Sequence, residues 1–238
     1  MRLPERGCTS QPPSTTVCSL RSLCVTVTGF SFEEVHEMTG MVRKALTIAA
    51  GLAVTASVAS AGVPDPRFST TDLVVVGNVS GTAIGAPPPG FDVVVRDVNN
   101  APLAGRTVTL DFSATPMKVY NAQNAGSTVN CPSKTISRVT NASGAVNFAA
   151  RIAKFINTNG VEVSADGVVL ALVKGRSTDI DGTDGTTGLG DFAIFGNNFL
   201  NNSAAQETDF DQSGTTALGD FAIFGSEFLG GASGTYCP

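Results

Sequence analysis

The chain repeats one octapeptide without change near its C-terminus, and each copy follows an acidic, glycine-containing loop. The sequence LGDFAIFG occupies residues 189–196 and recurs at residues 218–225, 29 residues later. Internal repetition constrains the fold strongly, because identical segments should form the same local structure twice. The C-terminal part is therefore expected to be a duplicated unit of a loop followed by a short helix with one phenylalanine-rich face.

The loop before the second copy has the spacing of a twelve-residue calcium loop. With Asp209 as position one, positions 1, 3, 5 and 12 are Asp209, Asp211, Ser213 and Asp220. Ca²⁺ prefers about six to eight oxygen ligands, and alternate side chains of such a loop point inward. Gly214 at position 6 permits the sharp turn, and the Thr215 carbonyl is expected to complete the ligand set.

The loop before the first copy is one residue longer. The offset between copies is 30 at Asp179 but 29 from Gly185 onward, so an extra residue should bulge between Asp181 and Asp184. The expected ligands are Asp179, Asp181, Asp184, Asp191 and the Thr186 carbonyl. This loop has more carboxylates and poorer geometry than the second, which leaves its occupancy open. The alternative for both loops is a pair of solvated Asp/Gly turns.

Charge divides the chain into two expected modules. Residues 62–176 carry ten Lys/Arg against seven Asp/Glu, whereas residues 177–238 carry nine acids and no Lys or Arg. A boundary near Arg176 or Ser177 follows.

The net charge of -5 argues against a nucleic-acid partner. The only histidine, His36, lies upstream of the expected mature chain, which argues against a histidine-dependent catalytic or metal site.

Residues 62–176 are expected to form a mainly β module. Short β-rich runs separated by Gly, Pro and Asn clusters occupy residues 73–76, 91–97, 106–112, 135–139, 145–152, 161–165 and 168–173. Asp166-Gly167 suits a two-residue type I′ hairpin turn. About seven strands in a module of this size favour an antiparallel sandwich.

Residues 41–61 have the layout of a secretory signal peptide: a basic start, an apolar run and the small residues Ala59-Ser60-Ala61. The run is too short to span a bilayer. Residues 1–40 are then interpreted as an upstream segment from a start codon assigned too early, with translation expected to begin at Met41, or at Met38 as the alternative that stays open. The mature chain holds two cysteines, Cys131 and Cys237, whose pairing the spacing does not decide. We expect them not to hold the fold together.

The first module resembles bacterial immunoglobulin-like domains of the invasin and intimin type. The phrases VVVRDVNNAPLAGRTVTLDFSA, VTNASGAVNFAARI and VEVSADGVVLALV carry the resemblance, in that order, over roughly residues 68–175. It implies an immunoglobulin-like β-sandwich that acts as a spacer or adhesive module without catalytic residues.

The second module resembles the dockerin domain (type I, with EF-hand-like calcium repeats) over about residues 177–231. The resemblance implies two bound Ca²⁺ ions and docking to a cohesin-like module. Asp191 and Asp220 fit the acid that ends a dockerin loop. In dockerins a Ser/Thr pair and basic residues often contact cohesin, and these have no equivalent in this chain. The usual recognition positions hold Leu189-Gly190 and Leu218-Gly219 instead. Calcium binding therefore carries over better than cohesin binding does.

The combined prediction is a secreted or cell-surface, non-enzymatic, calcium-binding protein. Its fold would be an immunoglobulin-like β-sandwich with a small C-terminal α domain of two calcium loop–helix repeats, attached to a cohesin-like or other envelope partner. One alternative is a calcium-stabilised structural or adhesive spacer without a cohesin partner. Another is a non-catalytic subunit of a polysaccharide-degrading assembly. No membrane span is expected in the mature chain.

Cleavage after Ala61 should give an exported protein that begins at Gly62. N-terminal sequencing of the exported material checks this prediction, and an intact Met1 on a cytoplasmic product would contradict it.

The acidic module is expected to fold only with calcium, because seven loop aspartates repel one another without a cation. Small modules have little apolar burial to offset that repulsion. Asp209→Ala should abolish the second site, and Asp184→Ala should weaken the first. Calcium titration followed by calorimetry and circular dichroism measures both effects.

Overall fold

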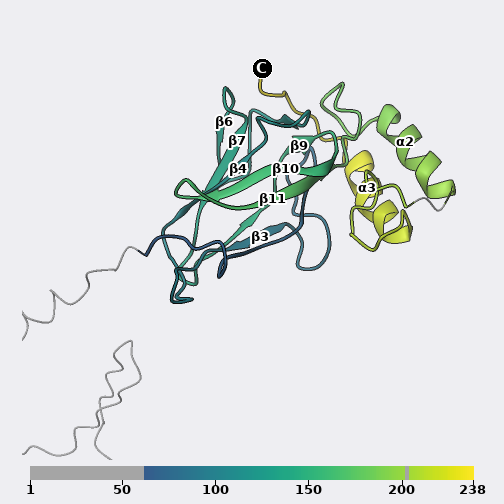
Figure 1. The fold of residues 1–238 in the computed structure, drawn as a ribbon. Coiled ribbons are helices and arrows are strands. Elements are labelled where there is room, and N and C mark those ends of the chain that lie inside the picture. The colour runs from purple at the N-terminus through teal and green to yellow at the C-terminus, as the bar shows by residue number, and fades with distance from the viewer. Residues whose placement is uncertain (1–61, 202–203) are drawn as a thin grey trace, which may run out of the picture. The chain divides into compact units, whose positions relative to one another are not determined.

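A computed structural model describes residues 62–201 and 204–238 (Figure 1). The strands in this part are β1 Thr70–Thr71, β2 Val74–Gly77, β3 Phe91–Val94, β4 Thr107–Asp111, β5 Lys118–Val119, β6 Thr128–Asn130, β7 Thr135–Val139, β8 Ala145–Phe148, β9 Ile152–Ala153, β10 Ile156–Ala165 and β11 Val168–Ser177. The helices are α2 Leu189–Leu200 and α3 Leu218–Gly230. The predicted upstream segment 1–40 and signal peptide 41–61 lie outside the described residues.

The strands form a six-stranded sheet in the order β2-β11-β10-β4-β7-β6, a three-stranded sheet β1-β3-β8 and a short pair β5-β9. Neighbouring strands pair antiparallel, except that β2 runs parallel to β11. The expectation of a wholly antiparallel arrangement is therefore wrong at this edge. A parallel pair needs a long connection rather than a hairpin, and β2 and β11 lie at opposite ends of the β part in sequence.

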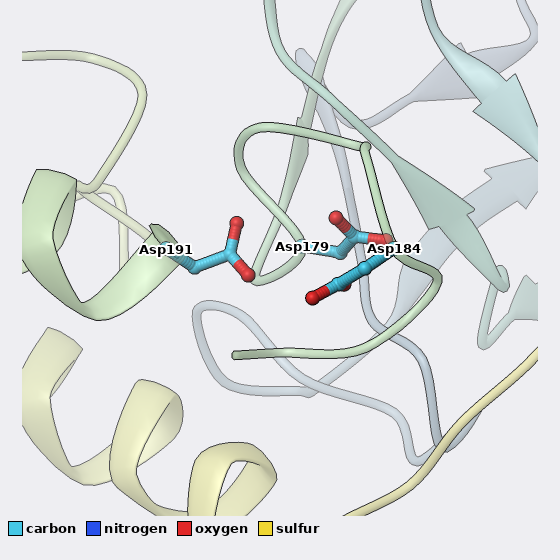
Figure 2. A group of neighbouring side chains, drawn as sticks. All are labelled: Asp179, Asp184 and Asp191. Carbon is cyan, nitrogen blue, oxygen red and sulfur yellow. The ribbon is translucent and has the colours of Figure 1, made fainter. Parts of the chain in front are cut away.

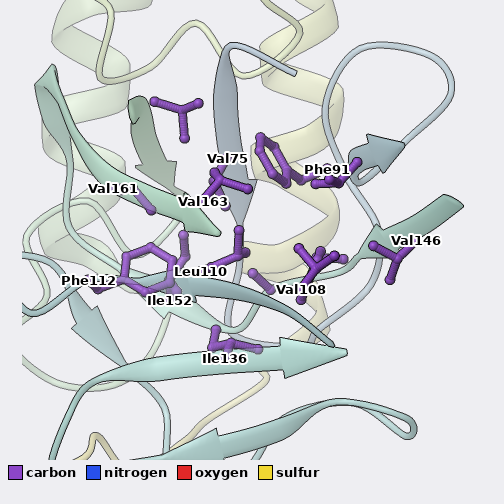
Figure 3. Close-up of a cluster of buried hydrophobic side chains, with 14 of the residues drawn as sticks. Val75, Phe91, Val108, Leu110, Phe112, Ile136, Val146, Ile152, Val161 and Val163 are labelled. Carbon is purple, nitrogen blue, oxygen red and sulfur yellow. The ribbon is translucent and has the colours of Figure 1, made fainter. Parts of the chain in front are cut away.

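The two larger sheets share one buried core (Figure 3). In β4, Val108 and Leu110 are buried while the flanking threonines and Asp111 are more exposed, which is the period-2 pattern of a strand with one buried face. Phe91 of β3 and Val146 of β8 join the same cluster from the three-stranded sheet. The chain is thus mainly β, as its strand pattern predicted, with two helices at its C-terminal end.

The predicted hairpin turn is confirmed. Ala165 pairs with Val168 across the two-residue turn Asp166-Gly167, and both turn residues have positive φ, at 47° and 82°. This left-handed backbone is what a type I′ turn requires, and it is why an Asp-Gly pair suits the position. The turn joins β10 and β11, the longest pair of neighbouring strands in the described chain.

Strand β2 is buried on both faces, and this places the helices. Alternating side chains of a strand point to opposite sides, so Val75 joins the core of the sheets while Val74 and Val76 join a second buried cluster. That second cluster includes Phe195 of α2 and Phe224 of α3, whose rings stack with centroids 4.7 Å apart. The helices therefore pack on each other and on the edge of the β sheet at once.

The chain after α3 returns to the β part. The Cys237 amide donates a hydrogen bond to the Val119 carbonyl at 2.7 Å, and Tyr236 forms a bridge with Tyr120. Cys237 also forms a disulfide with Cys131, in the turn between β6 and β7. The pairing that the sequence left open is therefore made, and two isolated thiols are excluded. The bridge fastens the C-terminus to the sheet, so we expect it to stabilise the fold, contrary to the expectation from the sequence alone.

Cys237→Ser should lower the free energy of unfolding by about 2–4 kcal/mol, because the bridge closes a loop of sequence separation 106 and restricts the unfolded chain. Denaturant melts of the oxidised protein measure this loss. The matched control is Cys131→Ser, and the double variant should cost no more than either single one, since each already removes the whole bridge. An unchanged free energy of unfolding in Cys237→Ser would show that the bridge does not stabilise the fold.

Candidate metal centres

The structure gathers carboxylates from the acidic loops into two clusters. Asp179, Asp184 and Asp191 form the first, and Asp209, Asp211 and Asp220 form the second. Within each cluster one oxygen from every residue lies within 4.8 Å of the others. Figure 2 shows Asp191 reaching from the start of α2 toward Asp179 and Asp184 on the loop. Each cluster could hold a metal ion.

The acid that ends each loop is positioned by the first turn of a helix. Asp191 accepts hydrogen bonds from the Asp181 amide at 2.9 Å and the Gly188 amide at 2.8 Å. Asp220 accepts the equivalent two hydrogen bonds, from the Asp211 amide at 2.9 Å and from the Ala217 amide at 2.8 Å. A carboxylate at a helix N-terminus is favoured by the exposed amides there. The repeated octapeptide therefore builds the same anchor twice.

Positive φ angles locate the extra residue of the first loop. Gly182 and Gln212 both have φ of 61°, with an offset of 30 residues, while Gly185 and Gly214 have φ of 76° and 97°, with an offset of 29. The insertion therefore lies between Gly182 and Gly185. This agrees with the bulge that the sequence predicted before Asp184. The second loop keeps its turn glycine without an insertion.

Two buried threonine pairs close the loops, and the sequence reading missed them. The hydroxyl groups of Thr178 and Thr187 lie 3.0 Å apart, and those of Thr208 and Thr216 lie 2.6 Å apart. Each pair joins the residue before the first aspartate to a residue near the start of the helix. The signal was present, since both threonines recur at the offsets of the repeat.

The first aspartate of the first loop is completely buried against the β part. The Asp179 carboxylate accepts hydrogen bonds from the hydroxyl groups of Tyr120 and Tyr236, and from the Gly182 amide at 2.9 Å. Burial raises the pKa of Asp179, and the hydrogen bonds oppose that shift. Burial and the nearby carboxylate raise the pKa of both tyrosines, so their hydroxyl groups stay protonated as donors.

The first aspartate of the second loop is buried against an arginine instead. Arg176, at the end of β11, places Nη1 3.1 Å from Oδ2 of Asp209, and both side chains are almost fully enclosed. The other oxygen of this carboxylate, Oδ1, is buried without a hydrogen-bond partner. Burying an unpaired carboxylate oxygen is costly, so this atom fits a site that a cation completes.

The remaining predicted ligands lie around the clusters. Asp181 is outside the first group, and its Oδ1 accepts bonds from the amide and hydroxyl group of Thr183, each at 2.7 Å. The Thr186 amide and hydroxyl group donate to Asp184 at 2.9 and 2.8 Å. Ser213 donates its hydroxyl group to the Thr215 carbonyl at 3.2 Å. The ligand roles of Asp181, Thr186, Ser213 and Thr215 stay predictions.

The electrostatics of both clusters favour a cation. Burial, followed by the charges of Asp179 and Asp181, raises the pKa of Asp191 to about 6 against two opposing backbone hydrogen bonds. Burial raises the pKa of Asp220 for the same reason, with Asp211 and Asp209 adding to the shift. Shifts of this direction mean that burial, with a smaller effect of the neighbouring carboxylates, disfavours the charged form of these groups, and a bound cation would offset both effects.

Comparison of the chain with protein-family models, with curated proteins and with solved structures found no match in any of the three. Within the described residues, no helix is long and apolar enough to cross a membrane.

Tyr120→Phe should lower the free energy of unfolding by about 1–3 kcal/mol, because it keeps the buried ring and removes one donor from a buried carboxylate. Urea denaturation at neutral pH measures the loss. Tyr236→Phe is the matched control and should cost less, since this side chain is only half-buried. Equal stability of Tyr120→Phe and the unaltered chain would contradict the role given to this hydroxyl group.

Proposed function

We propose that the two clusters are calcium sites. The observation that carries the proposal is the convergence of three aspartate oxygens per loop, at the positions of a calcium-loop pattern, with the buried and unpartnered Oδ1 of Asp209 in the second. Both groups are made of carboxylates without histidine or cysteine, which suits a hard cation. A ligand shell that mixes carboxylates, carbonyls and hydroxyl groups favours Ca²⁺ over the small, strictly octahedral Mg²⁺.

The chain's own residues would hold each ion with ligands that are already fixed in position. Asp191 and Asp220 are set by the helix starts, and the buried threonine pairs keep each loop closed. Asp179 and Asp209 are held from the β part, by tyrosine hydroxyl groups and by Arg176. Bound calcium supplies the positive charge that removes repulsion among these carboxylates.

We propose further that this is a secreted, non-enzymatic protein with an immunoglobulin-like β module and a dockerin-like calcium module. The disulfide supports export, since such bridges persist in oxidising compartments. Leu189 and Leu218, at the same position of the two repeats, are 78% and 75% exposed. Two exposed leucines at equivalent positions favour docking to a cohesin-like or other envelope partner through the helical pair.

A structural role is the second candidate, and a different observation favours it. The helices share a buried cluster with β2, and both loops are bonded to the β part. Calcium would then rigidify the whole chain without a docking partner. A non-catalytic place in a polysaccharide-degrading assembly is the third candidate, supported by the dockerin resemblance alone.

The full chain, freed of metal with a chelator, should bind two Ca²⁺ in isothermal calorimetry, and its melting temperature should rise with the logarithm of free calcium. The full chain is the right material because the helices share their core with β2. Asp184 is a full member of the first cluster, so Asp184→Asn should remove that site rather than only weaken it, and Asp211→Asn should remove the second site. Glu162→Gln, which changes an acid outside both clusters, is the matched control. No heat of binding and no shift in melting temperature would refute the calcium assignment.

Leu189→Glu together with Leu218→Glu should abolish binding to an envelope partner while leaving calcium binding unchanged, if docking is the function. Capture from envelope extract with calcium and with chelator measures the first effect. Leu73→Glu, which changes an exposed leucine of the β part, is the control. Equal capture by the paired variant would show that these two leucines do not form the docking surface, whereas no calcium-dependent capture by the unaltered chain would favour the structural role.

A further inference from the structure

We propose that Arg176 is a built-in counter-cation of the second loop, so that the second site binds calcium more weakly than the first and fills after it. This inference rests on the proposed calcium function and concerns the regulation of the same sites. It reverses the order that the loop spacing alone favours, in which the second loop is the better calcium site.

The first step is where the guanidinium lies. Arg176 is the last residue but one of β11, and it is 4% exposed. Its Nη1 lies 3.1 Å from Oδ2 of Asp209, whose carboxylate groups with those of Asp211 and Asp220. These are the three members of the second cluster. One fixed positive charge therefore already faces the full set of acids that a metal would use.

The second step is the contrast with the first cluster. The equivalent aspartate, Asp179, is held by two tyrosine hydroxyl groups, which carry no charge. Among the ion pairs of the described residues, none involves a member of the first cluster. The carboxylates of the first cluster have no paired cation, whereas Asp209 of the second cluster is paired with Arg176.

The third step is what this contrast does to binding. A cation shared by the second cluster must contact Asp209, whose Oδ2 is already paired with Arg176. Like charges at such separations repel strongly in a partly buried site. The guanidinium also neutralises part of the repulsion that calcium would otherwise relieve. The second loop should therefore gain less from calcium than the first, by about tenfold or more in affinity.

The unpartnered atoms show that the ion pair is incompletely satisfied on both sides. Oδ1 of Asp209, together with Nε and Nη1 of Arg176, is buried without a hydrogen-bond partner. The ion pair thus leaves two nitrogens of the guanidinium and one oxygen of the carboxylate without a hydrogen bond. A metal could use Oδ1 while Arg176 keeps Oδ2, and the guanidinium charge would still oppose it.

The test begins with variants that each keep one site in the full chain. Asp211→Asn leaves the first site, and Asp184→Asn leaves the second. Calcium titration by calorimetry should give a dissociation constant about tenfold or more lower for the first site than for the second. Adding Arg176→Gln to the Asp184→Asn chain should then tighten the remaining site by about tenfold. The calcium-dependent rise in melting temperature should also be larger in the chain with Arg176→Gln than in the chain with the native arginine.

Two controls isolate the charge. Arg176→Lys keeps a cation and should leave the second site near its native affinity. Arg106→Gln removes the arginine of another 3.1 Å ion pair, with Asp166, and should leave calcium binding unchanged. An Arg176→Gln chain with unchanged or weaker calcium binding would overturn the proposal and make Arg176 a positioning residue for Asp209.

The single-site comparison decides the matter even when Arg176→Gln does not fold, because those variants keep the native arginine. A second site that binds as tightly as the first overturns the proposal while the calcium function stands. Calcium binding at neither site in any variant is a different result, and it refutes the calcium function together with this inference.

Discussion

Burying the first carboxylate of each acidic loop against the β part is the interaction on which the rest of the structure depends. Asp179 accepts hydrogen bonds from Tyr120 of the β part and from Tyr236 of the C-terminal tail. Asp209 forms an ion pair with Arg176 at the end of β11. A buried carboxylate must find donors or a cation, because its desolvation is otherwise too costly. These two side chains therefore fix where the loops lie, and the loops in turn fix where α2 and α3 begin.

The same constraint explains why the helical pair and the sheets act as one unit. Val74 and Val76 of β2 join Phe195 and Phe224 in a single buried cluster, and the described residues group into one compact unit. The disulfide and the bridge between the two tyrosines close the assembly from the C-terminal side. A metal bound in the loops would act on this whole network, since its ligands are also contacts of the β part.

The two loops show how duplication and divergence combine. Both loops contain the same hydrogen bonds to the aspartate at the start of the following helix, and both contain a buried threonine pair. The partners of the first aspartate are not repeated, because they come from the β part and the C-terminal tail, neither of which is duplicated. One loop meets neutral hydroxyl groups and the other meets a guanidinium. Sites that share a sequence pattern therefore differ in charge through their surroundings.

The sequence by itself determined the local elements of this protein. The octapeptide repeat predicted two loop–helix units, the 30-to-29 offset predicted the bulge before Asp184, and Asp166-Gly167 predicted its hairpin turn. These features follow from short-range backbone preferences, which a sequence carries directly. Only the tertiary structure decided what lies against each loop, since Tyr120 is 59 residues from Asp179 and the disulfide spans 106 residues. Local pattern does not encode such contacts, because they arise when the chain buries its apolar strands and must then give every enclosed charge a partner.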